Sequence, residues 1–151
     1  MELFYKSTRD DSVRVTASKA ILKGLADDGG GFFLGGPTGF FPGTIPVLDK
    51  SLKELACMSY GEVAYEVMKL FLTDFTEEEL KSCIANAYDS KFDTTEIAPL
   101  VKADGAYFLE LFHGATIAFK DMALSILPHL MTTSAKKNNI KNDIAILTAT
   151  S

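Results

Sequence analysis

The sequence predicts a mixed α and β protein, with a mainly helical N-terminal domain followed by the beginning of an α/β domain. Three observations lead to this fold class. Residues 51–88 carry apolar side chains at helical spacing, residues 100–112 have the pattern of a β-hairpin, and residues 144–147 form a continuous apolar run. Such a run is typical of a strand buried on both faces in a parallel sheet. We therefore expect one domain at residues 1–97 and an incomplete second domain at residues 98–151.

The chain is expected to begin with a short extended segment and a helix. Residues 1–15 contain β-forming side chains separated by polar ones. Thr16 or Ser18 can cap a helix that runs to about Leu25. The Asp-Asp-Gly sequence at residues 27–29 is expected to end this helix.

Residues 29–43 form a glycine-rich segment with seven of the eleven glycines in the chain. It contains neither Gly-Lys-Ser/Thr nor a GxGxxG pattern, so the sequence does not predict a phosphate-binding loop here. We expect a tight loop with unusual backbone dihedral angles at the glycines. Its aromatic side chains are expected to pack against the core: Phe32, Phe33, Phe40 and Phe41.

The central region is expected to form helices at residues 51–58, 59–73 and 77–88. In the second helix one apolar face is predicted to be buried: Val63, Val67, Leu70 and Phe71. Thr76 and Glu79 form a capping-box pattern that opens the third helix. Its predicted buried stripe consists of Leu80, Ile84 and Ala87.

The C-terminal third is expected to contain a hairpin, a helix and one strand. Asp104-Gly105 is a strong signal for a two-residue hairpin turn. A helix is predicted from about Phe119 to Lys137, and Pro128 is expected to kink or split it. The strand at residues 144–147 would need neighbouring strands and covering helices. The sequence therefore looks truncated after Ser151.

Composition excludes several classes of function. The net charge of −5 argues against a nucleic-acid surface. The N-terminus lacks the features of a signal peptide, and no apolar run is long enough for a membrane helix. Cys57 and Cys83 are expected to be reduced thiols packed in helices, and no Cys/His spacing indicates a metal. We expect a soluble, cytoplasmic protein.

The segment from Glu110 to Asp121 contains the most informative chemistry. Lys120 is expected in the first turn of a helix, where the helix dipole and partial burial beside Phe112 and Phe119 would favour its neutral amine. A neutral lysine amine can form a Schiff base with a carbonyl group. The alternative is a surface lysine paired with Asp121, unless that carboxylate turns away to bind backbone N–H groups.

The sequence allows more than one role for two polar side chains near Lys120. His113 and Thr116 could orient a cofactor or a substrate, but His113 could equally well form a hydrogen bond with a loop carbonyl. Asp121 is expected to stabilise the start of the helix. His129 is expected on a helix surface.

The sequence LELFHGATIAFKD, ending at Asp121, resembles the cofactor-lysine motif of threonine synthases. Residues 15–30 are similar to the opening helix of that family, and Ile146–Ser151 resembles the start of its T-A-T-S-G-D-T-G loop. Two positions depart from the family pattern. Ala115 stands where proline is usual, and Gly31 stands where leucine is expected.

The resemblance implies the N-terminal part of a fold-type-II pyridoxal-phosphate enzyme. The family converts O-phospho-L-homoserine and water to L-threonine and phosphate. Lys120 would be the Schiff-base lysine and would exchange protons with the substrate, with Phe119, His113 and Thr116 beside the cofactor. Thr150 and Ser151 would bind the substrate carboxylate.

The resemblance also implies that the 151-residue chain alone is inactive, because most cofactor contacts would come from the remainder of its catalytic domain. Two alternatives stay open. One is a phospho-lyase that acts on another phosphorylated amine, and the other is a non-catalytic interaction module. The exposed edge of the predicted strand at residues 144–147 could also make the chain associate with itself.

Overall fold

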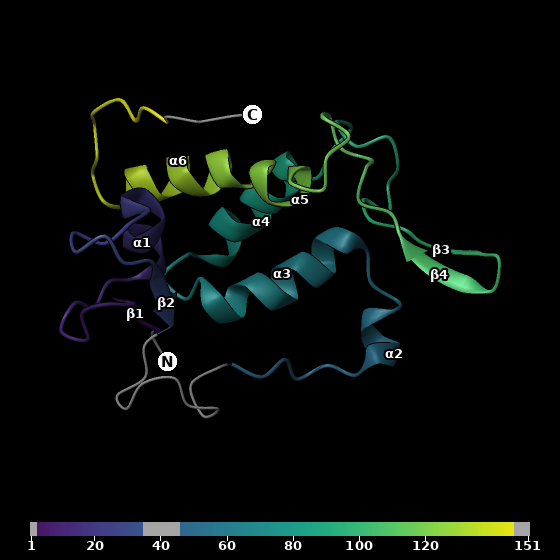
Figure 1. The fold of residues 1–151 in the computed structure, drawn as a ribbon, viewed down its shortest axis with the longest axis horizontal. Helices are drawn as coiled ribbons and strands as arrows, with labels where there is room; N and C mark the ends of the chain where they lie inside the picture. The colour runs from purple at the N-terminus through teal and green to yellow at the C-terminus, as the bar shows by residue number, and fades with distance from the viewer. Residues whose placement is uncertain (1–2, 35–45, 147–151) are drawn as a thin grey trace.

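The computed structural model describes residues 3–34 and 46–146. It has helices and two small antiparallel sheets, which confirms the predicted mixture of α and β structure (Figure 1). In chain order the elements are β1 (Tyr5–Ser7), α1 (Ala17–Lys23), β2 (Phe32–Leu34), α2 (Leu52–Leu55), α3 (Tyr60–Phe71), α4 (Glu77–Ala87), β3 (Leu100–Ala103), β4 (Ala106–Leu109), α5 (Asp121–Leu124) and α6 (Leu127–Lys137).

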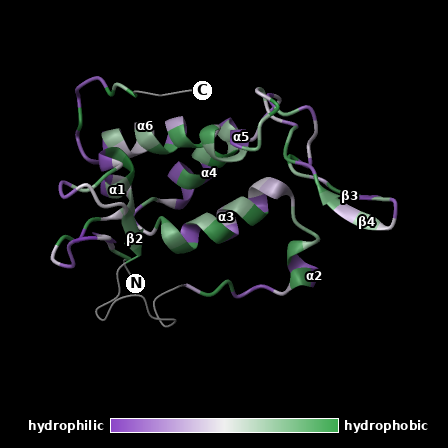
Figure 2. Ribbon diagram, viewed as in Figure 1, coloured by the Kyte–Doolittle hydropathy of each residue, from purple (hydrophilic) through white to green (hydrophobic). Residues whose placement is uncertain are grey.

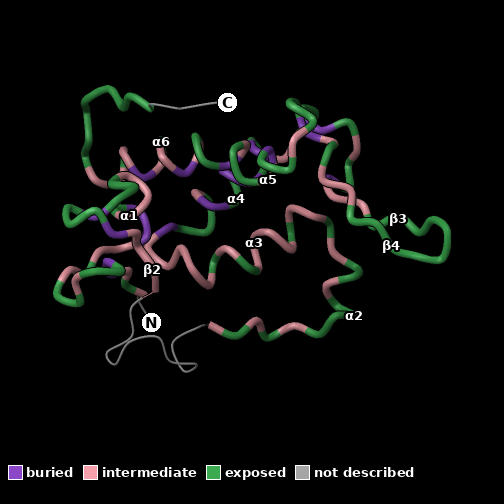
Figure 3. The backbone as a smooth tube through the Cα atoms, viewed as in Figure 1, coloured by how far each residue is buried: buried purple, intermediate pink, exposed green. Residues whose placement is uncertain are grey.

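The core surrounds α4, which contacts α3 on one side and α6 on the other, while α1 packs on α6 (Figure 1). The predicted buried stripe of α4 is confirmed, since Leu80, Ile84 and Ala87 are 1%, 4% and 0% exposed. Figure 3 shows buried residues concentrated along α4 and the facing side of α6. The remaining buried members of this core are Ala17, Phe75, Cys83, Ile126 and Leu130.

The start of α4 follows the predicted capping box. The Thr76 hydroxyl accepts the Glu79 N–H at 3.2 Å, and the Glu79 carboxylate accepts the Thr76 N–H at 2.8 Å. Ser51 with Glu54 and Ser59 with Glu62 form the same box at the starts of α2 and α3. These reciprocal bonds satisfy backbone donors that have no partner within the helix.

The N-terminal helix α1 begins after Thr16, at the expected position, but the Thr16 side chain forms no cap hydrogen bond and the helix ends earlier than predicted. Gly24 has φ = 68° and ψ = −74°, the conformation of a γ-turn, in which the Leu25 N–H donates to the Lys23 carbonyl at 2.8 Å, and this turn ends the helix. The Asp-Asp-Gly sequence instead forms a separate turn, in which the Gly29 N–H donates to the Ala26 carbonyl at 2.9 Å.

Part of the glycine-rich segment is a strand rather than a loop. Residues 32–34 pair antiparallel with β1, with Tyr5 opposite Leu34 and Ser7 opposite Phe32. Pairing with a strand 27 residues earlier in the chain overrides the local turn signal of the glycines. Phe40 and Phe41 lie outside the described residues.

Helix α3 turns a different face to the core from the one predicted. Ala64 and Met68 pack against the core, whereas Val67 is 39% exposed. The helix is apolar on more than one side, so spacing alone did not show which side meets α4. Cys57 is also exposed, contrary to expectation, because it follows the end of α2, while Cys83 is buried in α4.

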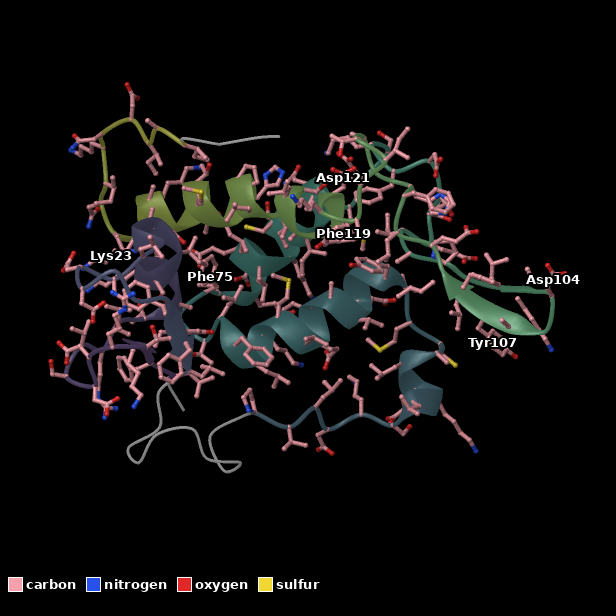
Figure 4. All side chains as sticks on the ribbon, in the orientation of Figure 1. Lys23, Phe75, Asp104, Tyr107, Phe119 and Asp121 are labelled. Atoms are coloured by element: carbon pink, nitrogen blue, oxygen red, sulfur yellow. The ribbon has the colours of Figure 1, made fainter. Side chains whose placement is uncertain are left out.

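The hairpin of β3 and β4 has the predicted two-residue turn. Asp104 and Gly105 have φ values of 48° and 79°, as a type I′ turn requires. Leu100 lies opposite Leu109 across the two strands. The hairpin extends away from the helical core, and Figure 4 shows Asp104 at its far end.

The predicted long helix is split as expected at Pro128, which occupies the first turn of α6. His129 lies on α6, as expected, and is half-buried there. The predicted strand is not formed at residues 144–146, where Ile144 and Ile146 are 42% and 62% exposed. A parallel strand needs a hydrogen-bonding neighbour, and neither sheet among the described residues provides one.

Residue 147, the last of the predicted strand, lies outside the described residues, so the strand edge that was expected to pair between copies of the chain is not seen.

Candidate functional site

The segment that follows β4 is held in place by the Asp121 carboxylate. The Thr116 N–H and hydroxyl both donate to this carboxylate, at 2.8 and 2.6 Å. These two bonds hold the pKa of the Asp121 carboxyl below its ordinary value, and the bond from the hydroxyl has the larger effect. Asp121 is 6% exposed and stands at the start of α5. The expectation that Asp121 stabilises the helix start stays a prediction, because its carboxylate binds Thr116 of the preceding loop and no side-chain hydrogen bond caps α5.

Gly114 is buried directly against Asp121. A Cβ atom at residue 114 would lie 2.5 Å from the Asp121 Cβ and 2.6 Å from its Oδ2. Only glycine allows the loop to approach the carboxylate so closely. The glycine of the motif therefore serves the geometry of the loop before Lys120.

We expect Gly114→Ala to lower the free energy of unfolding by about 1–3 kcal/mol, because the added methyl group must displace Asp121. Denaturation of the 151-residue chain in urea measures this change. Gly31→Ala is the matched control, since a Cβ there meets nothing within 4 Å, and it should change stability by less than about 0.5 kcal/mol. Equal stability of the two variants would contradict the proposed contact.

Lys120 immediately precedes α5, at the N-cap position of that helix. Its backbone carbonyl accepts the N–H groups of Ala123 and Leu124 at 3.0 and 2.8 Å. Its side chain is exposed, and its amine has no hydrogen-bond or ion-pair partner among residues 3–34 and 46–146. The alternative of a lysine paired with Asp121 is therefore wrong, because Thr116 binds that carboxylate instead.

The apolar side chains expected to bury Lys120 do not do so within the described part of the chain. Phe119 is 66% exposed and Phe112 is 49% exposed. Figure 4 shows Phe119 and Asp121 together near α5, on the side of the molecule from which the hairpin extends. Thr150 and Ser151 lie outside the described residues, so the structure does not place them relative to Lys120.

His113 binds two carboxylates rather than a loop carbonyl. Its Nδ1 lies 2.5 Å from the Asp93 carboxylate and its Nε2 lies 2.9 Å from that of Glu110. The hydrogen bonds with Glu110 and Asp93, in that order, raise the pKa of the His113 imidazole. Sequence reasoning missed both partners. Glu110 lies three residues before His113, so a comparison of nearby charged residues could have found this pair. Asp93 lies twenty residues away, and no local pattern in the sequence indicates that pair.

A pocket with a volume of about 640 Å³ lies between α3 and α4, where Tyr65, Glu66 and Lys81 contribute to its lining, and Lys120 does not line it. A smaller pocket of about 430 Å³ is lined by residues of the segment after α4, including Asp93 and Phe92. The described residues contain no group of three His, Cys, Asp or Glu side chains that could hold a metal ion. None of the described helices is long and apolar enough to cross a membrane.

Known proteins with a similar sequence are named threonine synthase or threonine synthase-like 2. The family described as "Threonine synthase N terminus" matches residues 4–88, more than half of the chain. Threonine synthase from Saccharomyces cerevisiae is 32% identical over 97% of this chain and 30% of its own length. Threonine synthase-like 2 from Xenopus laevis is 31% identical over 97% of this chain and 30% of its own length.

A solved structure has the same fold. The crystal structure of threonine synthase from Brucella melitensis with bound pyridoxal phosphate superposes with a TM-score of 0.73. It is 31% identical, and the match covers 91% of this chain and 28% of that one. The chain thus spans less than a third of the length of these relatives. By the family match over residues 4–88, the chain belongs to the threonine synthase N-terminus family.

Proposed function

We propose that this chain is the N-terminal part of a pyridoxal-phosphate-dependent threonine synthase that converts O-phospho-L-homoserine and water to L-threonine and phosphate. The observation that carries the proposal is the state of Lys120 within a motif typical of the family. Its amine is exposed and unpaired among the described residues, and the adjacent carboxylate of Asp121 is bound by Thr116. This lysine is therefore free to condense with an aldehyde.

The residues around Lys120 fit a bound pyridoxal phosphate. That cofactor supplies an electron sink for the bonds of an amino-acid substrate. Lys120 would hold it covalently and, once released by the substrate amine, would carry protons on its Nζ atom. Phe119 presents an exposed ring beside the lysine, which could cover one side of the cofactor.

His113 and Thr116 would support the cofactor mainly by fixing the loop. The Thr116 hydroxyl already donates to Asp121, and both ring nitrogens of His113 face carboxylates. Their polar groups are thus engaged within the protein. Thr150 and Ser151 would bind the substrate carboxylate through N–H and hydroxyl groups.

We further propose that residues 1–97 form one domain and that residues 98–151 begin the catalytic domain, whose remainder would cover the hairpin. The exposed apolar side chains of this region support that assignment, and Figures 2 and 3 show hydrophobic and exposed residues on the same hairpin. Those more than half exposed include Leu100, Tyr107, Phe108, Leu109, Ile117 and Phe119. A surface of this kind is typical of an interface.

The proposal includes inactivity of the 151-residue chain alone, a cytoplasmic location, and self-association of the isolated chain through its exposed apolar surface.

The deciding experiment incubates the full-length protein with pyridoxal phosphate and O-phospho-L-homoserine. We expect threonine and phosphate to appear in equal amounts, and we expect the 151-residue chain alone to form neither. Threonine formation by the isolated chain would refute the claim that it is incomplete. Absence of both products from the cofactor-loaded full-length protein would refute the proposed reaction.

A second candidate is a phospho-lyase that acts on another phosphorylated amine. It is favoured by the similarity to threonine synthase-like 2, whose name sets it apart from threonine synthase itself. Phosphate release from a phosphorylated amine other than O-phosphohomoserine, without threonine formation, would support this candidate over the first.

A further inference from the structure

His113 joins two parts of the chain at the beginning of the loop that leads to Lys120. Asp93 lies in the segment between α4 and β3, and Glu110 directly follows β4. The His113 side chain is only 14% exposed, compared with 74% for Asp93 and 26% for Glu110. The His113 carbonyl also accepts the Asp93 N–H at 3.0 Å, so backbone and side chain both connect these segments.

The two carboxylates define the protonation state that suits this site. A neutral imidazole has one N–H donor and one bare nitrogen, whereas the imidazolium has two N–H donors. Carboxylate oxygens lie 2.5 Å from Nδ1 and 2.9 Å from Nε2, and an ionised carboxylate can only accept. The imidazolium alone satisfies both contacts. A neutral ring would leave a lone pair facing a negative oxygen.

His113, Asp93 and Glu110 together form a clamp on the loop, and this clamp lies close to Lys120 in the chain. Gly114 follows His113 and packs on Asp121, which binds Thr116 and adjoins Lys120. A shift of His113 therefore acts on the contact between Gly114 and Asp121, which leaves no space for a Cβ atom. The Phe112 ring lies against the imidazole, with ring centroids 4.6 Å apart, and adds an aromatic contact to His113.

We propose that His113, as an imidazolium held between Asp93 and Glu110, is a positioning residue that fixes the loop before Lys120 and releases it when the imidazole loses its proton. The proposal depends on the proposed function only in that Lys120 is the residue whose position matters. The clamp itself requires no cofactor.

The direction of the pH dependence follows from the two partners. Asp93, from the segment after α4, and Glu110, from the end of β4, are the charged groups that act on the ring, and both raise the pKa of His113 above the ordinary value of 6.5. A group with a raised pKa in the folded state stabilises the fold fully below its unfolded value and loses that effect as pH rises through the folded value. The clamp is therefore closed while the imidazole is protonated and both carboxylates are ionised, and it opens as pH rises through the raised pKa of His113.

Nuclear magnetic resonance of the ¹⁵N-labelled 151-residue chain tests this directly. The chain has two histidines, so His129→Asn assigns the ring signals of His113. We expect the ring to titrate above pH 6.5 and the amide signals of Thr116 and Asp121 to move with the same midpoint. A ring that titrates at or below pH 6.5, or amide signals that do not follow it, would overturn the proposal.

Charge-neutral variants identify the partners. Glu110→Gln and Asp93→Asn should each lower the midpoint of the His113 ring titration, because each replaces a carboxylate that stabilises the imidazolium with a neutral amide. Asp89→Asn is the matched control in the same segment, where the carboxylate pairs with Lys91 at 2.5 Å, and it should leave the midpoint unchanged. An unchanged midpoint in both Glu110→Gln and Asp93→Asn would overturn the clamp.

His113→Arg separates charge from titration. Arginine keeps N–H donors and a permanent charge. We expect the amide signals of Thr116 and Asp121 to keep their low-pH positions up to pH 9 in this variant. If the amide signals still shifted with pH in His113→Arg, another titrating group would be the cause and the proposal would be refuted. No outcome depends on cofactor binding or threonine formation, so failure of the proposed function would leave this test intact.

Discussion

Replacing Lys120 with alanine in the full-length protein is expected to lower the rate of threonine formation by roughly 10²–10⁴-fold or more, because the variant lacks the amine that would hold the cofactor and carry protons. The absorbance band of the lysine-bound cofactor should disappear at the same time. Spectra after incubation with pyridoxal phosphate and a threonine assay measure both effects. The expectation rests on an exposed Lys120 amine that has no partner in the described part of the chain.

Two further variants make this test specific. Lys120→Arg preserves the positive charge at the start of α5 but cannot form the covalent bond, so it should lose activity as alanine does. Lys136→Ala is the matched control, because Lys136 is also exposed and unpaired among the described residues, on α6. It should retain full activity. Normal turnover in Lys120→Arg would eliminate the assignment of Lys120.

The largest effect on stability is expected for Leu80→Ala. Leu80 is 1% exposed at the centre of the core formed by α1, α4 and α6. Removal of three buried carbon atoms leaves a cavity and should lower the free energy of unfolding by about 2–5 kcal/mol. Since small domains have total stabilities of about 5–15 kcal/mol, this is a large fraction of the total. Urea denaturation of the 151-residue chain measures the change.

Leu52→Ala is the control for this variant. Leu52 also lies in a helix, α2, but it is 85% exposed, so its truncation should change the free energy of unfolding by less than about 0.5 kcal/mol. If the two leucine variants were destabilised equally, the core would not lie where the structure places it.

Several predictions that depended on neighbouring residues were confirmed. The capping box of Thr76 and Glu79, the Asp104-Gly105 turn and the break at Pro128 are each decided within a few residues. Their physics is local, since a cap or a turn is satisfied by groups close in the chain. Predictions that required a distant partner were less successful. The strand at residues 32–34 exists because Tyr5–Ser7 lies beside it, and residues 144–146 have no such neighbour.

The candidate site divides in the same way. The motif around Lys120 is contiguous, so the sequence by itself was enough to propose Lys120 as the Schiff-base lysine and to place Asp121 at the start of a helix. The tertiary structure alone brought Asp93 to His113 from twenty residues away and turned Ala64 and Met68, rather than Val67, toward the core. The spacing of apolar residues in the sequence indicates which of them share one face of a helix. Which face is buried, and which charges meet, depends on the packing of elements that are distant in the chain.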